Sequence, residues 1–359
     1  MSYFQKLVQH GSYNILSKFY NQIGHEDVQK PIFVGGCSFY ILGVEFKTKQ
    51  MDKQLAEQPP EVYLQYSSAA AFFRISNLFW MTYRSGYEKL PNSSLTTDVG
   101  WGCTIRAMQM MIANAMETIV YSGALNNTQT PYIPTKQEVM NVLIPFIDSP
   151  NSTTPLSIHH VYESRFVVEK NKSGVNYLAP SVVAKAYSDL VNSWKLCPIR
   201  CVMCSNVSIP THELSKLPFK PTLVFLPIVL NHLIHSKLQQ IYKSKLFAGI
   251  VGGMGDRAIF VFGFHALQFL YLDPHIVQPS FKSFTEIDTK SYSPIGSNRF
   301  SVHTIDPTKL DDFCTFGFLI KNLHEVDDFM KLAKDVFEIS NDKELRTSHD
   351  LNGFEVLDF

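Results

Sequence analysis

Apolar side chains recur at helical spacing directly after a polar loop near residue 100. Residues 91–97 read Pro-Asn-Ser-Ser-Leu-Thr-Thr, and the apolar positions that follow are three and four residues apart. Such spacing places apolar side chains on one face of a helix. The pattern therefore predicts a long amphipathic helix whose first turn holds Cys103. Its apolar face would consist of Ile105, Met108, Met111, Ile112, Ala115 and Ile119.

A second apolar pattern, from residue 259 to residue 272, is continuous rather than periodic. It is rich in Phe, Val, Ile and Tyr, which is typical of strands buried on both faces. We expect a hairpin of buried strands there, within a region from 221 to 271 that is dominated by strands. Helices are predicted after Pro180 and over 326–336. Segregation of helices from strands along the chain indicates the α+β class.

Polar segments separate these patterns. Residues 50–62, 126–136 and 148–154 are rich in Pro, Asn and Ser, and are predicted to be surface loops. The 359 residues allow one large domain or two modest ones, and 45% hydrophobic content supports a sizeable core.

Charge and hydropathy restrict the partners and the compartment. The 32 basic and 32 acidic side chains balance, and without a polybasic stripe the sequence argues against a nucleic-acid partner. Residues 1–11 lack an apolar signal region, and no run approaches the roughly 18 apolar residues of a spanning helix. We expect a cytoplasmic protein whose membrane contact is peripheral or made through a lipid-bearing substrate.

The position of Cys103 favours a reactive thiolate. The unpaired N–H groups and the positive end of the helix dipole stabilise a negative sulfur in the first turn, which lowers the thiol pKa. Gly100 and Gly102 leave a bare backbone that a substrate chain can approach closely. Free cysteine is also among the most buried residue types, so a packing role is an equal alternative at this point.

A histidine that could serve as the base follows the buried hairpin. In Tyr271-Leu272-Asp273-Pro274-His275, the carboxylate and the imidazole are two residues apart. On an extended backbone both point to one face, and a carboxylate there orients the ring. The alternative is a plain turn at the end of a strand. The other histidines, such as His159 and His235, are expected to be surface or structural residues.

Three further cysteines need a separate interpretation. The spacing of Cys197, Cys201 and Cys204 suggests a zinc or redox site, and a regulatory thiol among them is an open alternative. For zinc, the only nearby fourth ligand is His212, which lacks paired spacing. Residues 199–204 fit better as a core strand.

The two motifs resemble those of the autophagin family of cysteine peptidases, the autophagy enzymes that process a ubiquitin-like modifier. Residues 98–103 read Asp-Val-Gly-Trp-Gly-Cys, followed by Arg106 and Gln109, and residues 271–275 are followed by Gln278 and Pro279. The order Cys, Asp, His also differs from that of ordinary papain-type peptidases. The resemblance covers roughly residues 30–340. Further matching segments are 31–42, 78–84, 157–159, 221–227, 250–253 and 317–318.

The resemblance implies a fold and a set of roles. It implies a papain-like core over 31–340 with a small inserted subdomain at roughly 128–218. Cys103 would be the nucleophile, His275 the general base and then acid, and Asp273 the residue that orients it. Tyr83 would help the Cys103 N–H hold an oxyanion, although the local pattern alone places it in the core of an aromatic helical stretch. Trp101 would shape the groove beside the nucleophile.

The implied reaction is cleavage after the modifier's C-terminal glycine. The substrates would be the precursor of the modifier and its phosphatidylethanolamine conjugate, which is released by amide hydrolysis. Both reactions pass through a thioester, so no cofactor or metal is expected. We expect a monomer. Two alternatives remain: a non-catalytic adaptor that binds the modifier, and a hydrolase of a different ubiquitin-like protein.

The ends of the chain and the lid of the site carry further expectations. Residues 1–30 would be a partly flexible segment, and 341–359 a flexible tail in which Phe354 and Leu357 bind the modifier by strand addition. Family members close the cleft with a proline-bearing loop after a Gly-Gly pair, here Gly252 and Gly253, and with a tryptophan. Gly255 and Tyr177 occupy those two positions here, so we expect a more mobile loop and weaker closure.

Overall fold

The structure is a computed structural model that describes residues 33–49, 58–121, 124, 132–170, 178–205, 208–230, 232–281, 283–296 and 299–341. The predicted N-terminal segment, Tyr177 and the tail motif with Phe354 and Leu357 lie outside these residues.

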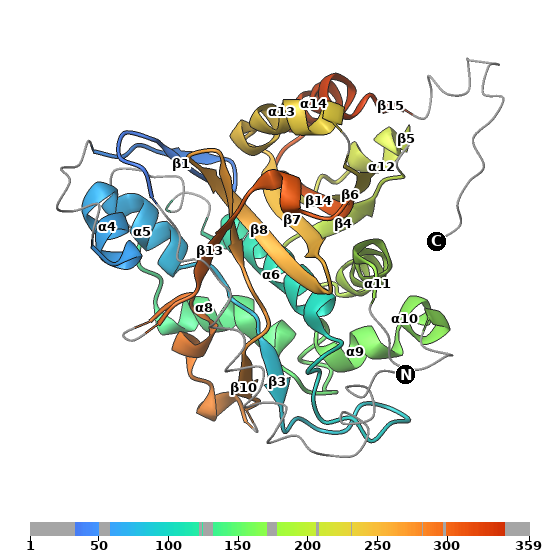
Figure 1. The fold of residues 1–359 in the computed structure, drawn as a ribbon. Helices are drawn as coiled ribbons and strands as arrows, with labels where there is room; N and C mark the ends of the chain where they lie inside the picture. Colours follow the sequence, from blue (N-terminus) through green and yellow to red (C-terminus); the bar gives the residue numbers. More distant parts are fainter. Residues whose placement is uncertain are drawn as a thin grey trace.

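A mostly antiparallel sheet forms the centre of the molecule (Figure 1). Its strands run in the order β13-β9-β8-β7-β14-β6-β4, with the β1–β2 hairpin attached to β8, and only β4 and β6 pair in parallel. These strands are β1 (Phe39–Ile41), β2 (Val44–Phe46), β4 (Arg200–Met203), β6 (Thr222–Val229), β7 (Phe247–Met254), β8 (Arg257–His265), β9 (Gln268–Leu272), β13 (Val302–Ile305) and β14 (Phe313–Ile320).

Helices cover both faces of this sheet. In Figure 1, α6 and α11 lie on one side of the sheet, and α13 and α14 lie on the other. The helices are α4 (Pro60–Ser67), α5 (Ala69–Ser76), α6 (Cys103–Val120), α8 (Lys136–Leu143), α9 (Ile158–Glu163), α10 (Arg165–Lys170), α11 (Pro180–Ser193), α12 (Thr211–Leu214), α13 (His232–Lys243) and α14 (His324–Leu332). Short 3₁₀ turns are Ile144–Phe146, Phe284–Glu286, Thr289–Tyr292 and Pro307–Lys309, and a π-helical turn, Ala333–Phe337, follows α14.

The two covered faces explain the unbroken apolar runs in the sequence. Along β8, Phe260 and Phe262 belong to the core beneath α6, whereas Ile259 and Val261 belong to the core beneath α13 and α14. Alternate side chains point to opposite faces of a strand, and here both faces are buried, so residues 258–262 are all apolar.

Small parallel and antiparallel pairs complete the described fold. Strand β3 (Tyr83–Ser85) pairs in parallel with β10 (Val277–Pro279), which brings two segments almost two hundred residues apart together. The other pairs are β5 (Ser208–Ile209) with β15 (Ser340–Asn341), and β11 (Ile295–Gly296) with β12 (Arg299–Phe300).

Most sequence predictions of elements are confirmed. The helix that begins at Cys103, the buried hairpin of β8 and β9, the helix from Pro180 and the strand near Cys201 are all present. Mixed helices and strands around a central sheet agree with the predicted class.

Three local predictions are wrong. Tyr83 lies in a strand, because its backbone pairs with the segment around Val277 rather than with its own helical neighbours. Residues 148–154 are not simply a surface loop, since Asp148 and Thr154 are buried and hydrogen-bonded. Helix α4 begins at Pro60, inside the expected loop 50–62. The helix expected over 326–336 is present: it runs from His324 and changes to π-helical geometry at Ala333.

Candidate active site

Cys103 is the first residue of α6, as the sequence predicts. Gly102 caps the helix without a side chain, so the first-turn N–H groups are not used by a capping oxygen. This end of α6 packs beneath β7 and β8, and the cysteine side chain is only 3% exposed. The thiol is therefore buried at the positive end of a long helix.

His275 and Asp273 lie in the segment that joins β9 to β10. The Asp273 carboxylate accepts a short hydrogen bond from His275 Nδ1, and its Oδ1 also accepts the His275 backbone N–H at 2.9 Å. The indole N–H of Trp80 donates to the Asp273 carbonyl at 2.8 Å. The predicted carboxylate–imidazole pair is therefore present. Asp273 is held by His275 through its side chain and by Trp80 through its backbone carbonyl.

The imidazole faces the thiol, and the two groups change each other's protonation. Burial lowers the pKa of His275, but the charge and hydrogen bond of Asp273, together with Cys103, outweigh it and raise that pKa to about 10. Burial raises the pKa of Asp273, but His275 outweighs it and holds that pKa at about 2.

The thiol itself is shifted toward the thiolate. Burial raises the pKa of Cys103, but the hydrogen bond and charge of His275 act against it. The backbone N–H of Ala258 and the hydroxyl of Tyr83 also hydrogen-bond to the sulfur. The pKa therefore lies below the usual value of 9.0. A thiolate beside an imidazolium is the stable form of the pair.

Tyr83 and Trp101 both lie beside Cys103, but they are held differently. The Tyr83 ring meets the His275 ring edge to face at a centroid distance of 5.3 Å, and its backbone N–H donates to the Pro274 carbonyl at 2.9 Å. The Trp101 indole N–H donates to the Thr97 carbonyl at 3.1 Å. Ala258 was not anticipated from the sequence, because only the packing of β8 on α6 brings its N–H to the sulfur.

The glycines assigned to the lid have structural explanations. A side chain on Gly252 would meet the Cys314 sulfur at 2.7 Å, and one on Gly253 would meet the Asp311 carboxylate at 2.2 Å. Gly255 has a φ of +67° in the two-residue turn between β7 and β8, where glycine is favoured. The expected lid segment 254–257 is therefore a tight hairpin turn in this structure.

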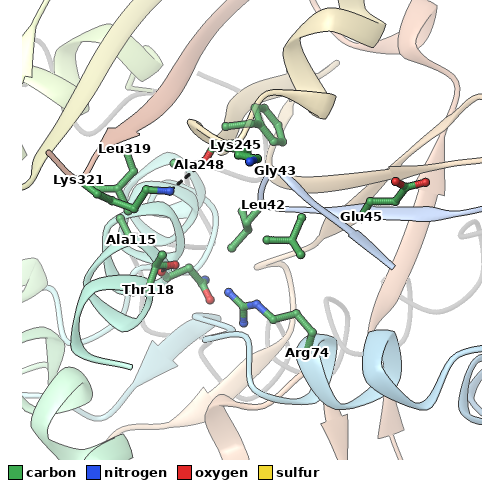
Figure 2. A pocket seen from close by; sticks show the side chains of 13 residues that line it. Leu42, Gly43, Glu45, Arg74, Ala115, Thr118, Lys245, Ala248, Leu319 and Lys321 are labelled. Atoms are coloured by element: carbon green, nitrogen blue, oxygen red, sulfur yellow. Dashed lines mark hydrogen bonds between the residues drawn. The ribbon is translucent and has the colours of Figure 1, made fainter. Parts of the chain in front are cut away.

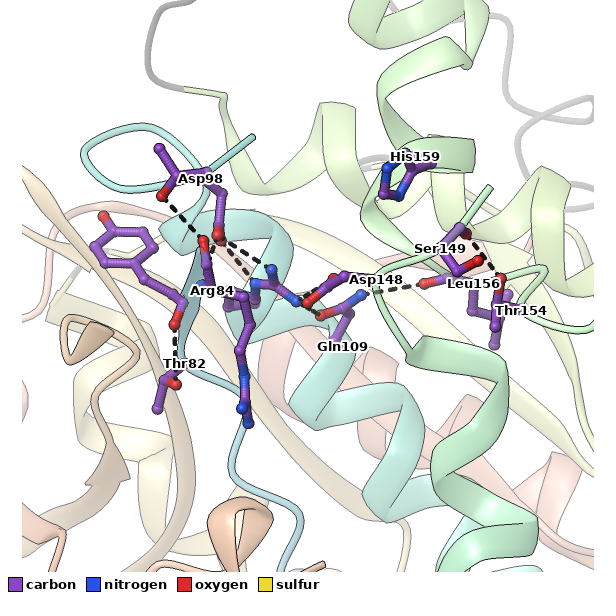
Figure 3. Close-up of polar contacts among 12 residues, drawn as sticks. Thr82, Arg84, Asp98, Gln109, Asp148, Ser149, Thr154, Leu156 and His159 are labelled. Carbon is purple, nitrogen blue, oxygen red and sulfur yellow. Dashed lines mark hydrogen bonds and ion pairs between the residues drawn. The ribbon is translucent and has the colours of Figure 1, made fainter. Parts of the chain in front are cut away.

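Figure 3 shows a buried polar network beneath the site, which the sequence did not reveal. Arg106 donates from Nε to Asp98 Oδ2 at 2.7 Å and from Nη1 to Asp148 Oδ1 at 2.9 Å. Gln109 accepts from Arg106 and donates to the Leu156 carbonyl. The sequence signal for this network is Arg106, a charged residue in the mostly apolar pattern of α6. Its partner Asp148 could not be recognised, because residues 148–154 were predicted to be a surface loop.

A pocket of 340 Å³ lies near the other end of α6 (Figure 2). Arg74, Lys245 and Lys321 line it together with Asn114 and Thr118 of the helix. None of the residues around Cys103 lines this pocket, so it is separate from the thiol site.

The remaining candidates play no part at this site. His159 is buried and hydrogen-bonds to the Glu88 carbonyl at 2.7 Å, as expected for a structural histidine. Burial raises the pKa of Cys197 to about 11 and that of Cys204 to about 12, which fits thiols in a core. Within the described ranges, no group of three His, Cys, Asp or Glu side chains could hold a metal ion. None of the helices described reaches the length and apolarity needed to cross a bilayer.

A cysteine at a helix N-terminus, in contact with an imidazole that is hydrogen-bonded to a carboxylate, is the arrangement typical of cysteine-dependent hydrolases. Comparison with known proteins agrees with this class. The model of the Peptidase C54 catalytic domain matches residues 70–332, so the chain belongs to the Peptidase C54 family.

Several curated proteins are similar to this chain. A probable cysteine protease atg4 of Schizosaccharomyces pombe is 27% identical over 314 residues, which cover 85% of this chain and 86% of that protein. A probable cysteine protease ATG4 of Debaryomyces hansenii is 28% identical over 334 residues, 88% of this chain and 63% of that protein. A cysteine protease ATG4 of Medicago truncatula is 26% identical over 300 residues, which cover 74% of this chain and 60% of that protein.

Proposed function

We propose that this chain is a cysteine endopeptidase that cleaves a ubiquitin-like autophagy modifier after its C-terminal glycine. The observation that carries the proposal is the contact of the Cys103 thiol with a His275 imidazole that Asp273 orients. Membership of the Peptidase C54 family and similarity to cysteine proteases named ATG4 support the substrate class.

The arrangement of the core supports a papain-like fold. The nucleophile begins the central helix α6, and the histidine follows strand β9 of the sheet on which that helix packs. We place the inserted subdomain of this fold at roughly residues 128–218.

In the first half of the reaction, the Cys103 thiolate attacks the carbonyl carbon of the modifier's terminal glycine. The oxyanion that forms accepts hydrogen bonds from the Cys103 N–H and the Tyr83 hydroxyl. Collapse of the intermediate breaks the C–N bond, and His275 gives its proton to the leaving amine. The glycine carbonyl is left as a thioester on Cys103.

In the second half, the neutral His275 takes a proton from water, and the resulting hydroxide attacks the thioester. The C–S bond breaks, the thiolate is restored beside the imidazolium, and the modifier leaves as a carboxylic acid that releases its proton to solvent. Asp273 keeps the imidazole in one orientation throughout, because it accepts from both the ring and the backbone of His275.

The same steps serve two leaving amines. The precursor releases a peptide amine, and the phosphatidylethanolamine conjugate releases the lipid amine, so one site would both mature and delipidate the modifier. The near-complete burial of Cys103 supports specificity for glycine, since a narrow slot excludes a side chain. Trp101 would form one wall of that slot, and the turn at Gly255, with Tyr177, would cover it.

The experiment that tests the proposal uses a modifier that carries extra residues after its glycine. Wild-type enzyme should remove them, whereas Cys103→Ala and His275→Ala should lower kcat/KM at least about 10³-fold. Cys201→Ala, a change at a buried cysteine of β4, is the matched control and should retain activity. Persistent cleavage by Cys103→Ala would refute the mechanism.

A further inference from the structure

Three separate chain segments must meet for the proposed reaction, and Asp98 lies where they are joined. Cys103 begins α6, Tyr83 lies in β3, and His275 precedes β10. Asp98 is fully buried in the loop just before α6, so it cannot contact the substrate directly.

The Asp98 carboxylate bonds to the two elements that carry Cys103 and Tyr83. Its Oδ1 accepts the backbone N–H of Arg84, the neighbour of Tyr83 in β3, at 2.7 Å. Its Oδ2 accepts Arg106 Nε of α6 at 2.7 Å, and Arg106 Nη2 adds a contact to Oδ1 at 3.1 Å. In Figure 3, Asp98 lies between Arg84 and the first turns of α6.

The backbone of Asp98 holds the start of α6 as well. Its carbonyl accepts the N–H of Gly102 at 2.9 Å and that of Trp101 at 3.2 Å. A side chain on Gly102 would approach Asp98 Oδ2 to 2.6 Å, so the glycine before the nucleophile makes room for this carboxylate.

The link continues to the third segment through β3. The Tyr83 N–H donates to the carbonyl of Pro274, which lies between Asp273 and His275. A continuous path of covalent and hydrogen bonds therefore runs from α6 through Asp98 and β3 to the histidine.

Charge does not explain why this network is buried here. Asp98 and Asp148 place two carboxylates around the single guanidinium of Arg106, so the formal balance is negative and would disfavour a nearby thiolate. The groups that lower the pKa of Cys103 are His275, Ala258 and Tyr83 instead. The contribution of the network must come from geometry.

We propose that Asp98, held by Arg106, is a positioning residue that fixes the Cys103 helix against the strand of Tyr83 and, through it, against His275. The inference rests on the proposed function of Cys103. Because misplacement by about 1 Å can cost roughly 10²-fold in rate, loss of Asp98 should affect kcat far more than KM.

The test compares Asp98→Asn and Arg106→Gln with Glu117→Gln. Glu117 is equally buried in α6 and pairs with Arg74 at 3.0 Å, near the pocket of Figure 2 and far from β3, so it is a matched control. For each variant, kcat and KM are measured with the extended modifier. The pH dependence of Cys103 alkylation by iodoacetamide is followed by mass spectrometry of the Cys103 peptide, and urea unfolding gives the folded fraction.

Asp98→Asn and Arg106→Gln should lower kcat about 10- to 100-fold per folded molecule and change KM less than about threefold. The alkylation midpoint should move up toward 9.0, the ordinary value for a thiol, because contact with His275 is loosened. Glu117→Gln should change stability but neither kcat nor the midpoint. If Asp98→Asn does not fold, Gly102→Ala, which displaces the same carboxylate and keeps every charge, should give the same two changes.

Two outcomes would overturn the inference. One is a wild-type kcat and alkylation midpoint in Asp98→Asn or, where that variant does not fold, in Gly102→Ala. The other is an equal loss in Glu117→Gln. In both cases inactivity of Cys103→Ala would leave the proposed function standing, whereas cleavage by Cys103→Ala would remove the proposed function itself.

Discussion

At the scale of single residues, Asp273 decides the charge of His275. Burial alone would keep the imidazole neutral, but the adjacent carboxylate raises its pKa to about 10. The thiolate–imidazolium pair exists where Cys103 has lost its proton and His275 has kept its own. Its population therefore rises through the Cys103 pKa, below 9.0, and falls as the pH passes about 10.

This order of pKa values predicts the pH profile of the enzyme. We expect kcat/KM to increase on the acid side as the thiol ionises, to remain level, and to fall only near pH 10 as His275 loses the proton that the leaving amine needs. A buffer series with the extended modifier measures it. A fall already centred near pH 6.5, the ordinary histidine value, would show that Asp273 does not raise the His275 pKa.

Asp273→Asn tests the same interaction by substitution. Burial lowers the His275 pKa, and Asp273 is the main group that raises it. Without the carboxylate, this pKa should therefore drop from about 10 toward or below 6.5. The alkaline limb should move down with it, and kcat should fall by about 10³- to 10⁴-fold. An unchanged alkaline limb would contradict the assignment of Asp273 as the orienting group.

The residues that the sequence could predict are those whose neighbours lie close along the chain. Cys103 precedes its own helix, and Asp273 lies two positions from His275, so local spacing was sufficient. Ala258 and Asp148 are distant from Cys103 in the sequence and reach the site only through tertiary packing, so no local pattern marked them. Asp98 belongs to the motif that ends at Cys103, but its contacts with Arg84 and Arg106 could not be deduced from spacing.

At the level of secondary-structure elements, β3 is the segment for which the local sequence pattern predicted a helix and the structure has a strand. Phe79 and Tyr83 are four residues apart, which suggests a helical face, but pairing with β10 gives this backbone its hydrogen bonds instead. Tertiary pairing therefore overrode the local pattern. By contrast, the β8–β9 hairpin was predictable because its apolar residues fill the cores on both faces of the sheet. The helix α6 was predictable as a helix, but it is buried on every face from Cys103 to Glu117 and not on one apolar face alone.

The junction of β1 with β8 gives a prediction about stability. A side chain on Gly263 of β8 would lie 2.4 Å from the backbone carbonyl of Tyr40, which cannot turn aside. Gly263→Ala should therefore destabilise the protein by about 1–3 kcal/mol, measured by urea unfolding. Gly296→Ala, whose added carbon meets nothing closer than 3.9 Å, is the control and should stay within about 0.5 kcal/mol of wild type. Equal stabilities of the two variants would contradict the close packing of β1 on β8.

At the scale of the whole molecule, catalysis and recruitment should be separable. The proposed catalytic residues come from α6, β3 and the segment between β9 and β10, whereas the tail motif of Phe354 and Leu357 stays a prediction from sequence. Deleting residues 354–359 should raise KM for the full-length modifier about tenfold and leave cleavage of a short glycine-ended peptide unchanged, because only the former uses a second contact. Equal losses with both substrates would place the tail in the catalytic unit instead.

During the proposed reaction Cys103 carries the modifier as a thioester formed with its C-terminal glycine. Rapid acid quenching, followed by mass spectrometry of the Cys103 peptide, detects this intermediate. We predict an adduct whose mass equals the acyl modifier ending at that glycine, formed on Cys103 at a rate consistent with turnover and absent together with cleavage in Cys103→Ala. Cleavage that proceeds without such an adduct, and persists in Cys103→Ala, would contradict the account.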